Sequence, residues 1–157
     1  MFSYNHLGYS TGFGMFSGFE GTIAFDQADP AKSSVEVSFP VETMLTGWQE
    51  RFDHFMTPDF FDAADDEMVT FTSTAIEVTG EKTAKITGDL TLNGVTKPVV
   101  LDTTFSGAGN NPFNKKPTVG FHATSVIKRS EFGISYAVPM ISDDVILDIS
   151  VAFEKAS

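Results

Sequence analysis

The stretch from Ile86 to Phe105, ITGDLTLNGVTKPVVLDTTF, predicts a β-hairpin. Apolar and polar residues alternate on both sides of Asn93-Gly94, and this pair suits a two-residue type I′ turn because both turn residues need positive φ. Such a short turn fixes the register and places Leu92 opposite Val95. One face of the hairpin then carries Ile86, Gly88, Leu90 and Leu92 together with Val95, Val99, Leu101 and Phe105, and Lys97 interrupts that face.

The same alternation recurs along most of the chain. Residues 34–39, 119–128 and 145–154 each present one apolar face, as half-buried strands do. Further strands are expected around residues 18–25 and 69–78, with a β-bulge near Thr74 to Ile76, where the alternation slips. Val, Ile and Thr together make up 38 of the 157 residues, which favours strands over helices.

One segment breaks this pattern. From Val41 to Met56 the apolar residues fall three and four apart, which predicts an amphipathic helix within residues 42–56. Thr57-Pro58-Asp59 offers an N-cap, a proline at the first helical position and an acid at the positive helix end. We therefore expect a short helical connection over about residues 42–62, with a second short helix through Phe60 and Phe61.

These elements predict a single domain over residues 1–157. Seven or eight short strands and one helical connection suit an all-β fold, an antiparallel eight-stranded barrel, because closure removes the exposed edges of a sheet. The interior of such a barrel is either filled by side chains or holds one small ligand. Strand pattern alone leaves both alternatives open.

Composition narrows the classes of partner. Ten basic residues stand against 21 acidic ones, a net charge of −11, so neither nucleic acid nor an anionic membrane surface is expected as a partner. The chain has no cysteine, which excludes disulfides and thiolate chemistry, and we expect neither a membrane span nor a signal peptide in it. Phenylalanine occurs 16 times, and these rings suit an apolar interior.

Four stretches carry a resemblance to a known family: FSYNHLGYSTGFGMFSGFEG (2–21), TGWQERFDHFMTPDFF (46–61), ITGDLTLNGVTKPVVLDTTFSG (86–107) and RSEFGI (129–134). In this order and spacing they resemble the YceI-like family of bacterial proteins over nearly the whole chain. The resemblance implies a lipocalin-like barrel around a long apolar tunnel that holds a polyisoprenoid lipid, an isoprenoid quinone or a fatty amide. It also implies a periplasmic or secreted location, with the cytoplasm as the alternative, and a homodimer is a further expectation.

The chain departs from the family at its start. In the family, about one strand of sequence usually precedes the position of Phe2, so the first strand is expected to be short or absent here. Either the start site at Met1 is internal to a longer protein, or the barrel has a weakened seam that pairs with something else, because a missing strand leaves its neighbours unpaired.

Strand parity and the helix face select the residues expected to line the tunnel. Burying a lipid tail against apolar walls is favourable by about 0.8 kcal/mol per CH₂ group, and a set of small inward residues, Gly88 and Ala123 among them, would leave room for it. The expected lining is Phe2, Phe25, Val37, Phe39, Phe52, Phe55, Phe60, Phe61, Phe71, Leu90, Leu92, Val99, Leu101, Phe121, Ile149 and Val151. Each of these side chains alone could equally be plain core.

Polar candidates are few. Lys97 is the candidate for contact with a lipid headgroup, although it could equally extend to solvent at the rim. Arg51 and Arg129 are expected to form structural salt bridges, and the net charge favours a neutral headgroup. The three histidines have no metal-ligand spacing, and the acidic residues of 59–67 are expected to form a solvated face.

No sequence pattern suggests a catalytic group, so we expect a lipid-binding protein that is not an enzyme and has no cofactor beyond a bound lipid or quinone. Two alternatives stay open. One is a redox protein or enzyme of the same fold that uses a quinone or haem, and the other is a ligand-free stress or interaction protein.

Overall fold

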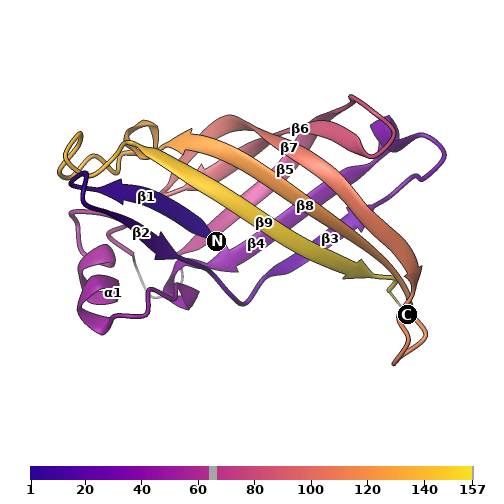
Figure 1. The fold of residues 1–157 in the computed structure, drawn as a ribbon, viewed down its shortest axis with the longest axis horizontal. Coiled ribbons are helices and arrows are strands. Elements are labelled where there is room, and N and C mark those ends of the chain that lie inside the picture. Colours follow the sequence, from indigo (N-terminus) through magenta and orange to yellow (C-terminus); the bar gives the residue numbers. More distant parts are fainter. Residues whose placement is uncertain (64–66, 157) are drawn as a thin grey trace.

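The computed structural model describes residues 1–63 and 67–156. Figure 1 shows a long, strongly twisted sheet with a short helix against one end. The strands are β1 (Phe2–His6), β2 (Ser10–Gly14), β3 (Glu20–Ala24), β4 (Ser34–Pro40), β5 (Met68–Val78), β6 (Thr83–Leu92), β7 (Val95–Asn110), β8 (Pro117–Lys128) and β9 (Asp144–Glu154). The helix is α1 (Gln49–Phe55), and single 3₁₀ turns are η1 (Pro30–Lys32), η2 (Val41–Thr43) and η3 (Arg129–Phe132).

The nine strands form one antiparallel sheet in the order β2-β1-β9-β8-β7-β6-β5-β4-β3. It curls into a half-barrel, so the expected antiparallel barrel class with a short helical connection is confirmed. There are nine strands rather than eight because the first residues form a complete hairpin, β1–β2. β1 is short, as expected, and pairs with β9 only at Phe2↔Leu147 and Ser3↔Ile146.

The hairpin β6–β7 has the register that its sequence predicts. Leu92 pairs with Val95 and Ile86 with Leu101. Asn93 and Gly94 both adopt positive φ, 52° and 70°, as a type I′ turn requires. The expected bulge in β5 is also present, with a shift in register between Ser73 and Ala75.

Contacts between aromatic rings join strands that lie far apart in the strand order and so stabilise the curvature of the sheet. Phe16, between β2 and β3, lies 5.6 Å from Phe2 of β1 and 4.8 Å from Phe39 of β4, measured between ring centroids. β1 and β4 lie near opposite ends of the strand order, so these contacts draw the two edges together. Phe25, just after β3, similarly lies 5.5 Å from Phe121 of β8 across the concave side.

The helix expected within residues 42–56 is present but covers only Gln49–Phe55. η2 ends at Thr43 and α1 begins only at Gln49. Between them, Met44 is extended (ψ 132°) and Gly47 has φ +73°, a conformation that ends helical structure. The spacing of three and four identified only part of the buried side of this connection, since Met44 is 3% and Phe55 8% exposed, whereas Leu45 and Trp48 are each 55% exposed.

The second short helix is absent. Residues 57–61 form a turn, in which the N–H of Phe60 donates to the carbonyl of Thr57 at 3.0 Å. The Thr57 hydroxyl donates backwards to the carbonyl of His54 instead of capping a new helix. Asp65 and Asp66 of the expected acidic face lie outside the described residues.

The hydrophobic core lies at the end of the half-barrel that α1 and η3 cover. It consists of Val41, Met44, Phe55, Phe60, Val69, Leu90, Leu92, Ile127, Phe132 and Ile134. The hairpin β6–β7 is joined to this end by a hydrogen bond from the Asn93 side-chain amide to the carbonyl of Phe132, 3.0 Å long. The fold therefore has one tightly packed end.

Candidate lipid-binding face

The concave side of the sheet carries a continuous apolar surface on β7, β8 and β9. On β9, every second residue from Val145 to Phe153 is partly buried, and the residues between them are exposed. The register extends this face across the sheet, because Val151 pairs with Phe121 and Phe121 pairs with Phe105. Apolar side chains of three neighbouring strands therefore form one continuous surface.

The residues expected to line a tunnel divide into three groups. Phe55, Phe60, Leu90 and Leu92 are buried in the core at the helix end. Those that are partly buried and pack against that core are Phe2, Phe39, Phe52, Phe61, Phe71 and Val99. The remainder are partly buried and lie outside the core cluster: Phe25, Val37, Leu101, Phe121, Ile149 and Val151. These last six define what we call the inner apolar face.

Phe105 lies beside these six residues, and we include it in the inner apolar face. It was not among the expected lining residues. Its ring centroid lies 6.2 Å from that of Phe25 and 5.9 Å from that of Phe121, so three rings meet on the concave side. The alternation of β7 had already placed Phe105 on the inward face. Strand parity was therefore a sufficient signal to include it.

The space expected above the small inward residues is partly occupied. A Cβ on Gly88 would overlap the ring of Phe71, which lies across the Gly88 backbone from the neighbouring strand. The expectation that Gly88 leaves open room was wrong, because a larger ring fills the place of its side chain. Ala123, between Thr103 of β7 and Ile149 of β9, is 6% exposed.

Two further glycines accommodate rings of the first strand. Gly12 lies beneath Tyr4 and Gly14 beneath Phe2 in the β1–β2 hairpin, and a Cβ at either position would overlap the ring. Burial raises the pKa of the Tyr4 phenol, although the nearby charges of Arg51 and Arg129 oppose the shift. The short first strand is thus secured by ring packing as well as by its pairing.

Arg129 is a structural residue, but it does not act through a salt bridge. It is 6% exposed, and its guanidinium donates to the backbone carbonyls of Ser142 (2.9 Å), Ile134 (3.0 Å) and Ile141 (2.9 Å). Among the described residues Arg51 likewise has no carboxylate partner and lies 5.3 Å from the Trp48 ring. The salt bridge expected for Arg129 is wrong, because backbone carbonyls accept its hydrogen bonds, and among residues 1–63 and 67–156 the guanidinium of Arg51 lies over an aromatic ring instead of a carboxylate.

Lys97 lies opposite Leu90 in the register and close to the Asn93-Gly94 turn. The side chain is exposed, even though its strand position is on the concave side. Its contact with a headgroup stays a prediction.

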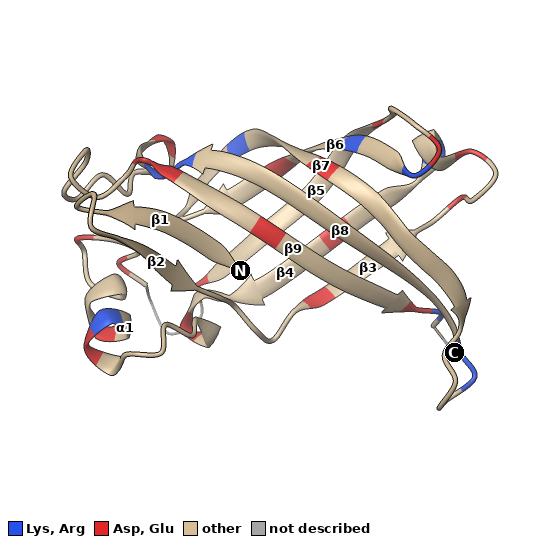
Figure 2. Ribbon diagram, viewed as in Figure 1, with Lys and Arg blue, Asp and Glu red and all other residues tan. Residues whose placement is uncertain are grey.

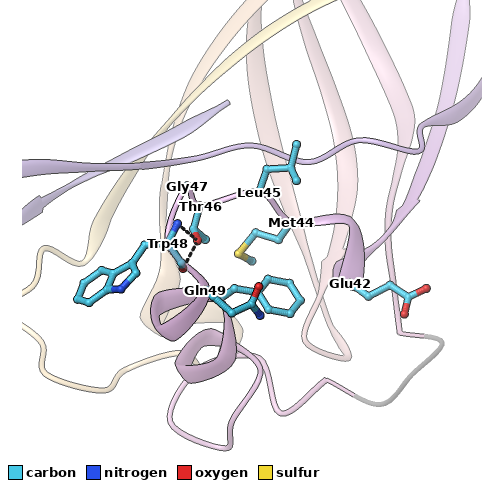
Figure 3. A pocket seen from close by; sticks show the side chains of 8 residues that line it. Glu42, Met44, Leu45, Thr46, Gly47, Trp48 and Gln49 are labelled. Atoms are coloured by element: carbon cyan, nitrogen blue, oxygen red, sulfur yellow. Dashed lines mark hydrogen bonds between the residues drawn. The ribbon is translucent and has the colours of Figure 1, made fainter.

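A separate hollow of about 340 Å³ lies beside α1. Its walls are Glu42, Met44, Leu45, Thr46, Gly47, Trp48, Gln49 and Phe52. In Figure 3 the Met44 side chain points toward Gln49, while the Trp48 indole points away from the hollow. Because polar and apolar groups alternate around it, this hollow suits an extended lipid chain less well than the inner apolar face does.

The described part of the chain holds no group of three or more side chains placed to bind a metal ion. His54 is paired with Asp59 (2.9 Å) and His122 with Asp148 (3.2 Å), each between ring nitrogen and carboxylate oxygen. In the ranges that the structure covers, no helix is both long and apolar enough to cross a membrane.

Comparison with known proteins gives a consistent result. The model of the YceI-like domain matches residues 1–153. A UPF0312 protein of Pseudomonas savastanoi is 41% identical over 153 residues, which cover 98% of this chain and 78% of the relative. The crystal structure of the Campylobacter jejuni YceI protein superposes with a TM-score of 0.86 at 31% identity, covering 98% of this chain and 90% of that one.

A polyisoprenoid-binding domain from Saccharophagus degradans has the same fold, with a TM-score of 0.69 at 15% identity, over 99% of this chain and 92% of that domain. At this identity the likeness concerns the fold alone. The family model and the Pseudomonas relative both extend over nearly all of the sequence, from the short first strand to β9. The chain therefore belongs to the YceI-like family.

Proposed function

We propose that the protein binds a long-chain lipid, a polyisoprenoid, an isoprenoid quinone or a fatty amide, along the inner apolar face, and sequesters or carries it. One observation carries the proposal. The side chains of the inner apolar face are apolar and only partly buried, so the protein keeps apolar surface that a ligand can cover. The polyisoprenoid-binding neighbour supports the same class of ligand.

The physical basis is burial of the lipid tail. Each CH₂ group that leaves water contributes about 0.8 kcal/mol, so affinity grows with chain length until the face is covered. The rings of Phe25, Phe105 and Phe121 already contact one another and therefore lose little conformational freedom when a tail packs on them. A rigid, apolar surface of this kind fits a binding protein better than an enzyme.

Three finer expectations belong to the proposal. The headgroup is neutral, because a chain of net charge −11 repels a diphosphate. The protein acts in the periplasm or outside the cell, as the family resemblance implies, and it forms a homodimer. Size-exclusion chromatography with light scattering tests the dimer, and cell fractionation tests the location.

Native purification followed by solvent extraction and mass spectrometry tests the binding itself. A lipid that co-purifies in near-equal molar amount is the expected result. Visible absorption of the same sample tests for the haem-using redox alternative, because haem would give intense visible bands that none of the proposed lipids has. Purified protein that neither contains nor takes up a lipid would leave the ligand-free alternative.

A matched pair of variants on β9 locates the ligand. Ile149→Glu places a carboxylate on the inner apolar face, and Ile146→Glu places the same group on the opposite side of the same strand, where Ile146 is 52% exposed. Lipid retention should fall at least tenfold in the first variant and stay unchanged in the second. Circular dichroism of both variants checks that they fold, and equal retention in two folded variants would overturn the proposal.

A further inference from the structure

The turn between β7 and β8 presents an aromatic ring to solvent. Residues 111–116 read NPFNKK, and Phe113 in this turn is 93% exposed. The turn extends past the end of the sheet next to the C-terminus, at the opposite end from α1 (Figure 1). We call residues 111–116 the tip loop.

The tip loop is held in a defined shape. The side-chain amides of Asn111 and Asn114 both donate to Oε1 of Glu154, at 2.9 and 2.8 Å, and these hydrogen bonds lower the pKa of the Glu154 carboxyl. The N–H of Phe113 donates to Oδ1 of Asn111 at 2.9 Å. The exposed ring therefore stands on an ordered loop, and its exposure is a built feature of the fold.

Basic residues surround this ring in an otherwise acidic protein. Lys115 and Lys116 are the second and third residues after Phe113, and the backbone N–H of Lys155 donates to the carbonyl of Pro117 at 2.8 Å, which places a third lysine at the same end. Three of the ten basic residues thus gather here, although the net charge of the chain is −11. Figure 2 shows the positive charge at this turn, with acidic residues spread along the strands.

The positive charge is available to a partner. Within residues 1–63 and 67–156, the carboxylate that hydrogen-bonds to the loop is that of Glu154, which the two asparagines engage and on which the charge of Lys116 also acts. The Lys115 ammonium donates to the carbonyl of Pro112 at 2.7 Å, so it lies against the turn that carries the ring. A fixed aromatic ring beside cations is the combination that binds the interface of an anionic bilayer.

We propose that the tip loop docks the protein on an anionic lipid surface, with the Phe113 ring inserted at the level of the headgroups and the lysines against the phosphates. The loop continues directly into the inner apolar face. Ala108 pairs with Val119, and the next inward pair toward the helix end is Phe105 with Phe121. Docking by this loop would bring that face to the membrane from which a lipid is taken.

Sedimentation of the full chain with lipid vesicles tests the proposal. Binding to phosphatidylcholine vesicles that contain phosphatidylglycerol should be clear at low salt and weaker at physiological salt. Phe113→Ser should reduce it about tenfold, and Phe113→Trp should preserve it. Lys115→Asn with Lys116→Gln should reduce it about 25-fold, since each lysine near an anionic surface contributes about fivefold. Asparagine tolerates the positive φ of Lys115 (63°).

Tyr9→Ser is the matched control. Tyr9 is 91% exposed but lies in the β1–β2 turn, at the end that α1 covers, so its loss should leave vesicle binding unchanged. The proposal would be overturned if Phe113→Ser bound vesicles as well as the wild type, or if Tyr9→Ser lost as much binding as Phe113→Ser. It would also be overturned if the wild type bound vesicles of phosphatidylcholine alone as well as vesicles that contain phosphatidylglycerol. Vesicle binding needs no bound ligand, so it can succeed or fail independently of lipid retention.

Discussion

The ring of Phe71 on β5 lies against the backbone of Gly88 on β6, in the space that any side chain at position 88 would need. A Cβ there would also stand 2.7 Å from the carbonyl oxygen of Thr72, which is backbone and cannot turn aside. The glycine and the ring therefore act as one packing unit next to the core. Strand pattern identifies both residues as inward-facing, but it does not show that one occupies the place of the other.

Gly88→Ala should lower the free energy of unfolding by about 1–3 kcal/mol, because the added methyl group overlaps both the ring and the carbonyl. Urea denaturation measures the change. Gly109→Ala is the control, since no atom lies within 4 Å of a Cβ at that position in β7. Equal stabilities of the two variants would contradict the packing of Phe71 on Gly88.

Arg129→Ala should destabilise the protein by about 3 kcal/mol, because the buried carbonyls of Ser142, Ile134 and Ile141 lose their donor. Lysine at this position should restore only part of the loss, since one ammonium does not reproduce the planar arrangement of three donors. Chemical denaturation of both variants checks this. The neighbouring Lys128, whose pair with Asp144 is exposed to solvent, serves as the control, and Lys128→Ala should change stability little.

The carboxyl group of Asp143 makes the free energy of unfolding depend on pH in the acid range. Burial would raise the pKa of its carboxyl, but two hydrogen bonds from Ser130 and the charges of Lys128 and Arg129 hold that pKa below the ordinary 3.8. A carboxyl with a lowered pKa stabilises the fold above its unfolded-state pKa, and this contribution is lost as the pH falls through the folded-state pKa.

Asp143→Asn should therefore melt at a lower temperature than the wild type at pH 7, and the difference should shrink as the pH falls below about 4. Thermal denaturation at several pH values measures the effect. Asp102→Asn, which removes one member of an exposed pair with Lys85, should leave the curve unchanged. A difference between wild type and Asp143→Asn that stayed constant down to pH 2 would rule out this linkage.

Ligand charge should decide between lipids of equal length. Because the net charge is −11, we expect an isoprenoid quinone to bind more tightly than a polyprenyl diphosphate with the same number of isoprene units. Competition binding in low salt measures the ratio, and the preference should fall as salt is added. The variant Lys97→Ala checks the headgroup contact. If the wild type bound the diphosphate more tightly than the quinone, and Lys97→Ala lost that preference, the ligand would have a charged headgroup that contacts Lys97.

The short-range rules of strands determined much of the fold. The period of two placed Phe121, Ile149 and Val151 on one face, and Asn93-Gly94 set the register of β6 and β7, because these properties depend on neighbouring residues only. The helical connection was less predictable. Its apolar spacing identified Met44 and Phe55 as buried but not the exposure of Leu45 and Trp48, and the connection is divided into η2 and α1, with Gly47 at positive φ between them.

Only the tertiary structure decided which inward residues are core and which are available to a ligand. Leu90 and Leu101 lie on the same face of one hairpin, yet Leu90 is packed into the core and Leu101 is outside that cluster. The difference comes from α1 and η3, which cover one end of the sheet and leave the other open. Likewise, Phe25 meets Phe105 and Phe121 because the sheet curls. Curvature and covering elements bring together residues far apart in the chain, and no local pattern of the sequence contains that information.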